Sequence, residues 1–162
     1  MDESNVTVQF KIEPHIIPAT AIQKSGQSPD CSGGFGDFTN KGTIPVSQSF
    51  ITIKVAVKVI KVLPDAGMQT LQKISKDIRR EAYVWILLSH DNILPLEGVT
   101  EGFGPLPALV TLWMENGSLE DCLRREVGLS WERKLSMVRE IAAGLQYCFI
   151  PGTLCRNDGS TI

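Results

Sequence analysis

Apolar and polar positions alternate most regularly between Ile51 and Ile60. The odd-numbered positions carry isoleucine or valine, and the even-numbered ones are mostly polar or small. This period of two predicts a β-strand with one buried face. Ala56 and Lys58 share the opposite face of that strand.

The pattern then changes to a spacing of three and four residues, after a break at Pro64, Asp65 and Gly67. Such spacing predicts an amphipathic helix, which should end near Ser89. Its apolar stripe consists of Leu71, Ile74, Ile78, Ala82, Trp85 and Leu88.

Further elements are predicted on both sides of these two. The runs 93–99 and 109–114 read as strands that pair across a Gly/Pro loop. Ser118 with Asp121 predicts the cap of a short helix to Arg125, and Ser130 can cap a longer helix that reaches Tyr147. Prolines interrupt residues 1–30, which are expected to form an irregular leader that can end in a strand.

Composition narrows the function classes. The 162 residues suit one domain, with 43% hydrophobic and 21% charged residues, as in soluble globular proteins. The 16 basic and 18 acidic residues give a net charge of −2, without the basic excess of a nucleic-acid or membrane-surface binder. No signal peptide or transmembrane segment is evident, so a cytoplasmic or nuclear protein is expected. Four cysteines without a C-x-x-C pair predict reduced thiols, not a zinc site.

Candidate chemistry begins with a glycine-rich turn at residues 31–38. Several glycines let backbone N–H groups converge as a cradle for phosphates. On the predicted strand, Lys58 supplies a positive charge for phosphate oxygens and Ala56 leaves room for a flat base. On the predicted helix, Glu81 lies next to the inner-face positions and can reach Lys58 as an ion pair.

This order of features resembles the small lobe of a protein kinase. Three further segments are similar to that family in sequence: residues 89–98, the stretch 110–119, and the helix 131–147. The resemblance covers residues 31–147, with a small lobe and hinge at 31–114 and the start of a large lobe at 115–147. It implies an α+β fold, in which a kinase-like small lobe of antiparallel sheet and one long helix precedes two helices of an incomplete large lobe.

The resemblance also implies the ligands ATP and Mg²⁺ and their contacts. Thr111 would be the gatekeeper before the adenine-binding hinge, and Glu81 would pair with Lys58. The residues implied in ATP binding are Ser32, Gly33, Gly34, Phe35, Gly36, Phe38, Ala56, Lys58, Thr111, Leu112, Trp113 and Met114.

The chain departs from the family pattern in two places. Cys31 and Phe38 replace a glycine and a valine of the glycine-rich motif. There is no D-F-G, and by family spacing the catalytic aspartate falls on Asn157, whose amide cannot act as a general base. No catalytic residue is therefore intact, and the Mg²⁺ ligands are absent. Residues 148–162 are either a degenerate catalytic loop or, the favoured explanation, unrelated sequence from a misread splice junction or a frameshift.

The expected function is that of a protein kinase domain, which transfers phosphoryl groups from ATP to Ser, Thr or Tyr hydroxyls of proteins. The chain itself is expected to be an inactive fragment. The alternatives are a non-catalytic, pseudokinase-like interaction module and a gene fragment without a function. The apolar stripe of the helix Trp131–Tyr147 predicts low solubility or a protein partner that covers it.

Overall fold

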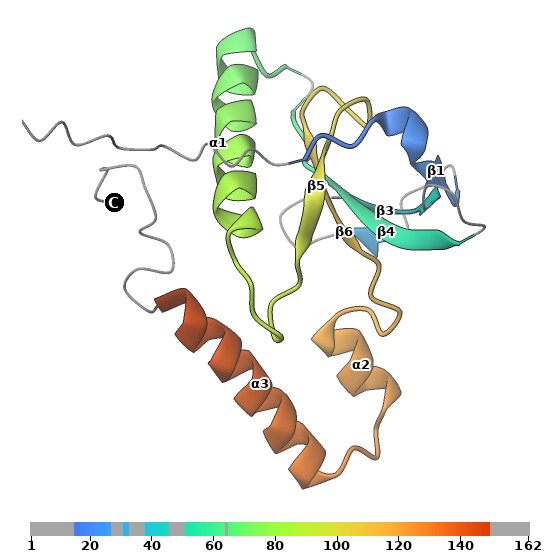
Figure 1. Cartoon of the computed structure of the whole chain (residues 1–162), viewed down its shortest axis with the longest axis vertical. Coiled ribbons are helices and arrows are strands. Elements are labelled where there is room, and N and C mark those ends of the chain that lie inside the picture. The colour runs from blue at the N-terminus through green and yellow to red at the C-terminus, as the bar shows by residue number, and fades with distance from the viewer. Residues whose placement is uncertain (1–14, 27–30, 33–37, 46–50, 64, 150–162) are drawn as a thin grey trace, which may run out of the picture.

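The computed structural model describes residues 15–26, 31–32, 38–45, 51–63 and 65–149. Figure 1 shows a twisted sheet with one long helix, α1, beside it and two helices, α2 and α3, below. The strands are β1 (Gln23–Lys24), β2 (Cys31–Ser32), β3 (Phe38–Pro45), β4 (Thr52–Val59), β5 (Leu96–Thr100) and β6 (Ala108–Leu112). The helices are a short 3₁₀ turn, η1 (Ala19–Ala21), then α1 (Met68–Ile86), α2 (Leu119–Arg125) and α3 (Trp131–Phe149).

The sheet is antiparallel, with the strand order β1-β3-β4-β6-β5 and β2 also paired to β3. The predicted α+β fold, a sheet with one long helix followed by two helices, is therefore confirmed. So is the predicted pairing of β5 with β6 across the Gly/Pro loop. The first of these strands begins at Leu96 and not at residue 93.

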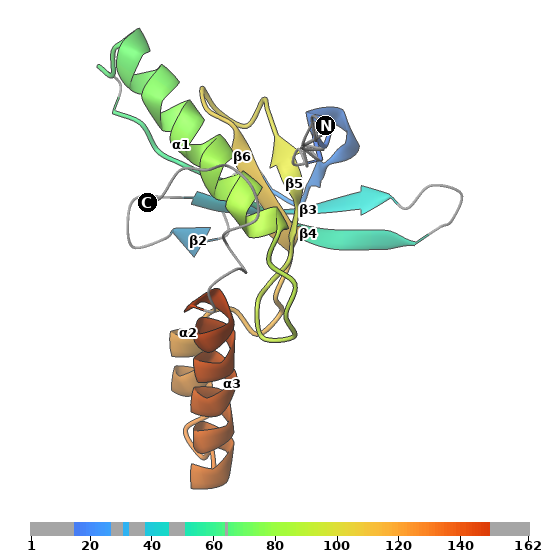
Figure 2. The ribbon, with the colours of Figure 1, turned by 60° about the vertical axis from the view of Figure 1, so that its left-hand side comes forward.

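The alternating strand around Lys58 is confirmed as β4, but only its centre is buried. Val55 and Val57 have at most 1% of their surface exposed, whereas Ile51 and Ile53 are 65% and 41% exposed. Figure 2 shows the reason: β3 and β4 extend together beyond the rest of the sheet. The apolar alternation therefore continues past the segment that other elements cover.

Two clusters of buried residues lie on opposite faces of the sheet, because neighbouring positions on a strand point to opposite sides. One cluster combines Val55, Val57 and Val110 with Ile17 and Ile22 of the N-terminal segment. The other packs α1 against β5, β6 and the loop between them. Its buried members are Ile78, Ala82, Leu96, Val99, Leu106 and Leu109.

The N-terminal segment wraps the sheet from one edge strand to the other. At one edge the N–H of Ile17 donates to the carbonyl of Val99, and the N–H of Val99 donates to the carbonyl of His15, both at 2.8 Å. At the other edge β1 pairs with β3. The approach is so close that a Cβ on Gly98 would lie 2.3 Å from the His15 carbonyl oxygen. Residues 15–24 thus bind to the sheet along their length.

Helix α1 follows the predicted stripe and buries Ile78 and Ala82. It ends at Ile86, slightly before the predicted Ser89, and the following turn is held by the Trp85 side chain. The indole N–H of Trp85 donates to the Leu94 carbonyl at 2.7 Å. This bond connects the end of the helix to the start of the loop that enters β5.

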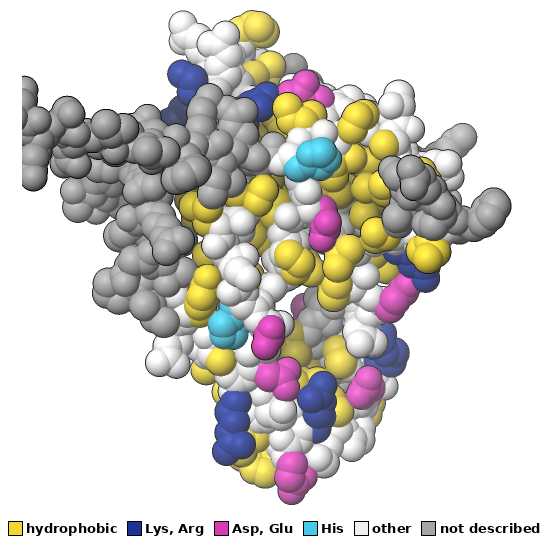
Figure 3. Space-filling model, viewed as in Figure 1, with side chains coloured by type: hydrophobic (Ala, Val, Ile, Leu, Met, Phe, Trp, Pro, Cys, Tyr) yellow, Lys and Arg dark blue, Asp and Glu magenta, His cyan; other side chains and the backbone are white. Residues whose placement is uncertain are grey.

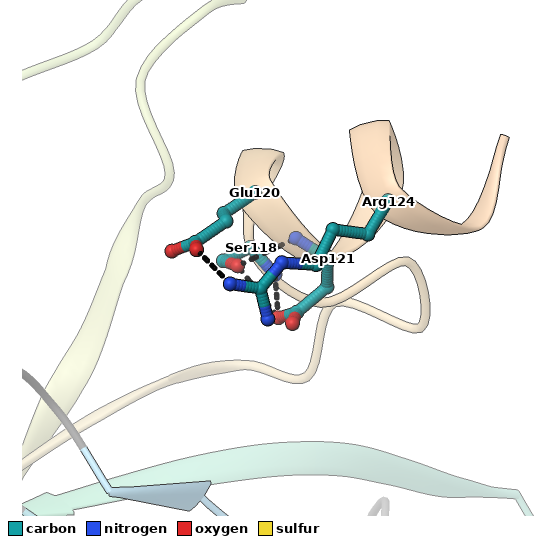
Figure 4. A network of polar contacts seen from close by, with 4 residues as sticks. All are labelled: Ser118, Glu120, Asp121 and Arg124. Atoms are coloured by element: carbon teal, nitrogen blue, oxygen red, sulfur yellow. Dashed lines mark hydrogen bonds and ion pairs between the residues drawn. The ribbon is translucent and has the colours of Figure 1, made fainter. Parts of the chain in front are cut away.

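Helix α2 begins with the predicted cap. The backbone N–H of Asp121 donates to the Ser118 hydroxyl oxygen, and the Asp121 carboxylate accepts from the Ser118 backbone N–H (Figure 4). These reciprocal bonds satisfy two N–H groups that the first turn would leave unpaired. Arg124 forms an ion pair with Glu120 one turn away.

Helix α3 is mostly exposed, including its apolar side chains. Its contact to the upper part of the chain is made by Gly144 and Tyr147, which lie against the turn at residues 89–92. Along the helix, Trp131, Val138, Ile141, Leu145 and Phe149 are 46–81% exposed. The predicted apolar stripe is therefore largely uncovered in this structure, although its member Leu135 is half-buried. Among the described helices, none is both long and apolar enough to cross a bilayer.

Candidate functional site

The candidate site lies on the sheet face that α1 covers only in part. Lys54, Ala56 and Lys58 alternate with the buried valines of β4 and so point to this face. Ala56 pairs with Thr111 on the adjacent strand β6. A methyl group beside a threonine that is 7% exposed makes a flat, largely apolar surface. Such a surface suits an aromatic ring.

The segment after β6 provides hydrogen-bonding groups next to this surface. The backbone N–H of Trp113 donates to the Lys54 carbonyl at 3.0 Å. Because backbone groups alternate in direction along an extended chain, the carbonyl of Leu112 and the N–H of Met114 point away from β4. An acceptor and a donor at this spacing match the edge of a purine base.

Three charged side chains, Lys41, Lys54 and Glu115, form ion pairs next to the segment after β6. The Glu115 carboxylate accepts from the Lys54 ammonium at 2.5 Å and lies 3.8 Å from the Lys41 nitrogen. Lys41 also stands over the Trp113 ring, 4.9 Å from its centre. The hydrogen bond from Lys54, and more weakly the charges of both lysines, lower the pKa of Glu115. This carboxylate is therefore ionised at neutral pH.

The phosphate side of the predicted site is only partly described. Lys58 is half-buried, and its backbone pairs with Thr39 on β3 and Leu109 on β6. The backbones of Ser32 and Phe38 pair with each other where β2 meets β3. The remaining turn residues, Gly33, Gly34, Phe35 and Gly36, lie outside the described residues. Their predicted role as a phosphate cradle stays a prediction.

Glu81 does not meet Lys58 in this structure: among the described residues, no ion pair joins the two side chains. The Glu81 side chain is exposed and lines a groove of about 550 Å³ beside α1, with Trp85 and Leu88. On the other side of the helix, Arg79 pairs with Glu101 at 2.8 Å. The ion pair of Glu81 with Lys58 remains a prediction for a different position of α1.

The acidic residues that would hold a metal ion are not gathered here. Within the described part of the chain, no three His, Cys, Asp or Glu side chains come together as a metal site. Asn157, the residue at the predicted position of the catalytic base, lies outside the described residues. The site therefore presents groups that suit a nucleotide's base and Lys58 for its phosphates, but no described set of metal ligands.

The structure also brings together residues that the sequence pattern does not single out. Lys41, Lys54 and Glu115 come from β3, β4 and the segment after β6. Of these three, only Lys54 could be placed near the site from the sequence, because the alternating pattern puts it on the strand face of Ala56 and Lys58. Cys122 and Cys148, the cysteines whose surroundings are described, are free thiols.

Figure 3 shows acidic and basic side chains interspersed over α2 and α3, with apolar side chains more frequent over the sheet. The site described above combines the basic residues Lys41, Lys54 and Lys58 with the acidic Glu115.

Comparison with known proteins identifies the family of the chain. Residues 31–150, about three quarters of the chain, match the family described as protein tyrosine and serine/threonine kinase. The matched stretch includes β4, α1, the segment after β6 and all of α3.

Individual relatives come from two groups. The chain is 40% identical over 96 residues to ephrin type-A receptor 3 of Danio rerio, covering 59% of the chain and 9% of that protein. It is 32% identical over 121 residues to receptor-interacting serine/threonine-protein kinase 3 of Rattus norvegicus, covering 71% of the chain and 21% of that protein. It is 30% identical over 154 residues to ephrin type-A receptor 5 of Rattus norvegicus, covering 86% of the chain and 14% of that protein. The chain thus spans a fifth or less of most of these relatives.

Proposed function

The chain belongs to the protein tyrosine and serine/threonine kinase family, and on this premise we propose that it forms a nucleotide-binding small lobe and hinge. Proteins of this family use ATP and Mg²⁺. The observation that carries the proposal is the pairing of Ala56 with Thr111 beside the hinge segment 112–114. Together they offer a flat surface and a donor–acceptor edge to an adenine ring.

Each proposed contact has a distinct task. The Leu112 carbonyl and the Met114 N–H would hold the exocyclic amine and a ring nitrogen of adenine. Lys58, on the same strand face as Ala56, would approach the phosphates as a point charge. When bound, Mg²⁺ supplies charge neutralisation between the phosphate oxygens; no described residues of this chain form a site for it.

We further propose that these 162 residues do not catalyse phosphoryl transfer by themselves. The sequence contains no D-F-G, and Asn157 stands at the position of the base. Loss of a positioned base costs about 10²–10⁴ in rate, and loss of metal ligands adds to it. Phosphorylation of any protein by the purified chain, above the level of a Lys58→Met variant, would contradict this.

A thermal-shift titration with ATP and Mg²⁺ tests nucleotide binding. A ligand that binds only the folded protein raises its melting temperature as its concentration exceeds Kd. We expect ATP to stabilise the chain and the Lys58→Met variant to lose most of that stabilisation. Lys76→Met, at an exposed position of α1, is the matched control and should respond as the parent does. If ATP does not raise the melting temperature of the parent chain, the proposal is wrong.

A non-catalytic interaction module is the second candidate, and the exposed apolar side chains of α3 favour it. Trp131 and Leu145 are 71% and 55% exposed, which is unusual for such large apolar groups on one helix. Stabilisation of the chain by a protein partner but not by ATP would select this function. Retention of binding after Lys58→Met, and its loss after Leu145→Lys, would place the partner on α3.

A further inference from the structure

We propose that Glu115 is a positioning residue, which holds the hinge segment 112–114 against β3 and β4 through Lys54 and Lys41. The proposal rests on the proposed nucleotide-binding function, because it assigns the Glu115 cluster a task at that site. It adds three side chains that the family motifs of the sequence do not include.

The cluster lies at the outer edge of the flat surface formed by Ala56 and Thr111. Lys41 pairs across the strands with Ala56, and Lys54 is two residues before Ala56 on the same face. Both lysines therefore flank the flat surface on its outer side. Glu115 directly follows the segment whose backbone would meet adenine, so its two ion pairs act within one residue of Met114.

The contacts of the cluster converge on the same short segment. The backbone bond from Trp113 to the Lys54 carbonyl sets the direction of the hinge groups. The side chain of that same Lys54 binds Glu115, and Lys41 contacts both Glu115 and the Trp113 ring. Residues on either side of Met114 are thus connected to the sheet by the same two lysines.

An isolated surface ion pair contributes little, but a carboxylate shared by two lysines forms a network, which is the exception. The Lys41 side chain is 27% exposed, the least of the three charged groups. It also has an aromatic face beside it, so its position does not depend on the carboxylate alone.

Hydrogen exchange of the nucleotide-free chain tests the positioning directly. We expect Glu115→Gln to speed exchange at the Trp113 amide, which bonds the Lys54 carbonyl, by about threefold to tenfold, with the β6 amide of Val110 unchanged. Lys54→Met should act like Glu115→Gln, whereas Lys54→Arg keeps the charge and should restore slow exchange. Glu97→Gln, at an exposed position of β5, is the control. Because Glu115 is exposed, its amide variant is expected to fold.

The ATP titration of the same variants separates this proposal from the function on which it rests. Faster hinge exchange with an ATP Kd raised by about threefold or more supports the proposal. Unchanged hinge exchange in Glu115→Gln overturns it, whether or not ATP binds. Faster exchange with an unchanged Kd also overturns it, because the ordering then has no use at the site. If the parent chain binds no ATP but Glu115→Gln loosens the hinge, the ordering is supported and the nucleotide function fails.

Discussion

The backbone N–H of Ser89 donates a hydrogen bond to the hydroxyl of Tyr147, 3.2 Å away. These residues lie 58 positions apart, one just after α1 and the other near the end of α3. The Tyr147 ring also lies 5.1 Å from the ring of His90. The contact connects α3 to the turn behind α1, where a Cβ on Gly144 would lie 3.0 Å from the Asn92 carbonyl oxygen.

Tyr147→Phe is expected to loosen α3 without unfolding the sheet. The change removes one hydrogen bond, worth about 0.5–1.5 kcal/mol, and keeps the ring against His90. Hydrogen exchange should accelerate along α3 while the amides of β4 stay protected. Tyr147→Ala should accelerate it further, because the ring contact is lost too. Equal protection of α3 in Tyr147→Ala and the parent chain would show that the contact does not hold the helix.

Two neighbouring isoleucines provide a test of the N-terminal segment. Ile17 is 7% exposed and belongs to the core on one face of the sheet, whereas Ile16 is 65% exposed. Ile17→Ala should lower the free energy of unfolding by about 2–5 kcal/mol. Ile16→Ala, the matched control, should stay within about 0.5 kcal/mol of the parent. Urea denaturation measures both, and equal effects would mean that the segment does not pack as described.

The difference between these two isoleucines was not predictable from the sequence. The apolar positions of the segment follow no sustained period, and its hydrogen bonds go to Val99 and to β3 far along the chain. β4 and α1 were predictable because each carries a regular pattern long enough to identify its type. The capping box of α2 was also predictable, since its two partners lie three residues apart.

The candidate site was predictable to the extent that it lies on single elements. Ala56 and Lys58 share a strand face by alternation alone, and the structure confirms this placement. The position of Glu81 depends on how α1 packs, which local spacing does not determine. The Glu115 cluster depends on the register of two strand pairs, so its members are far apart in the sequence.

The capping box makes the start of α2 sensitive to acid. Hydrogen bonds from the Ser118 hydroxyl first, and from its backbone N–H second, lower the pKa of Asp121. A carboxylate with a lowered pKa stabilises the folded state fully above its unfolded pKa of about 3.9 and loses this effect as the pH falls through the folded value. The protection factors of the α2 amides, which correct each exchange rate for the intrinsic rate at that pH, should therefore fall below about pH 4.

Two variants check that Asp121 causes this acid response. Asp121→Asn should lower the protection of the α2 amides at every pH. The same variant should remove the change in that protection between neutral and acid conditions. Ser118→Ala should destabilise α2 by about 1 kcal/mol. Glu126→Gln, just after the helix, is the control and should keep the acid response. An acid response that persists in Asp121→Asn would assign it to another carboxylate.

The apolar face of α3 leads to a prediction about solubility. Val138 and Ile141 are 61% and 46% exposed, so replacing either with lysine removes apolar surface from water without opening the core. Ile141→Lys should raise the concentration at which the 162-residue chain stays monomeric and change its unfolding free energy by no more than about 0.5 kcal/mol. Gln146→Lys adds the same charge at an exposed polar position of α3 and should leave self-association unchanged. Light scattering and urea denaturation measure the two quantities on the same samples. If Ile141→Lys destabilises the chain by several kcal/mol, this face is covered in solution, and the exposure of α3 does not describe the chain in water.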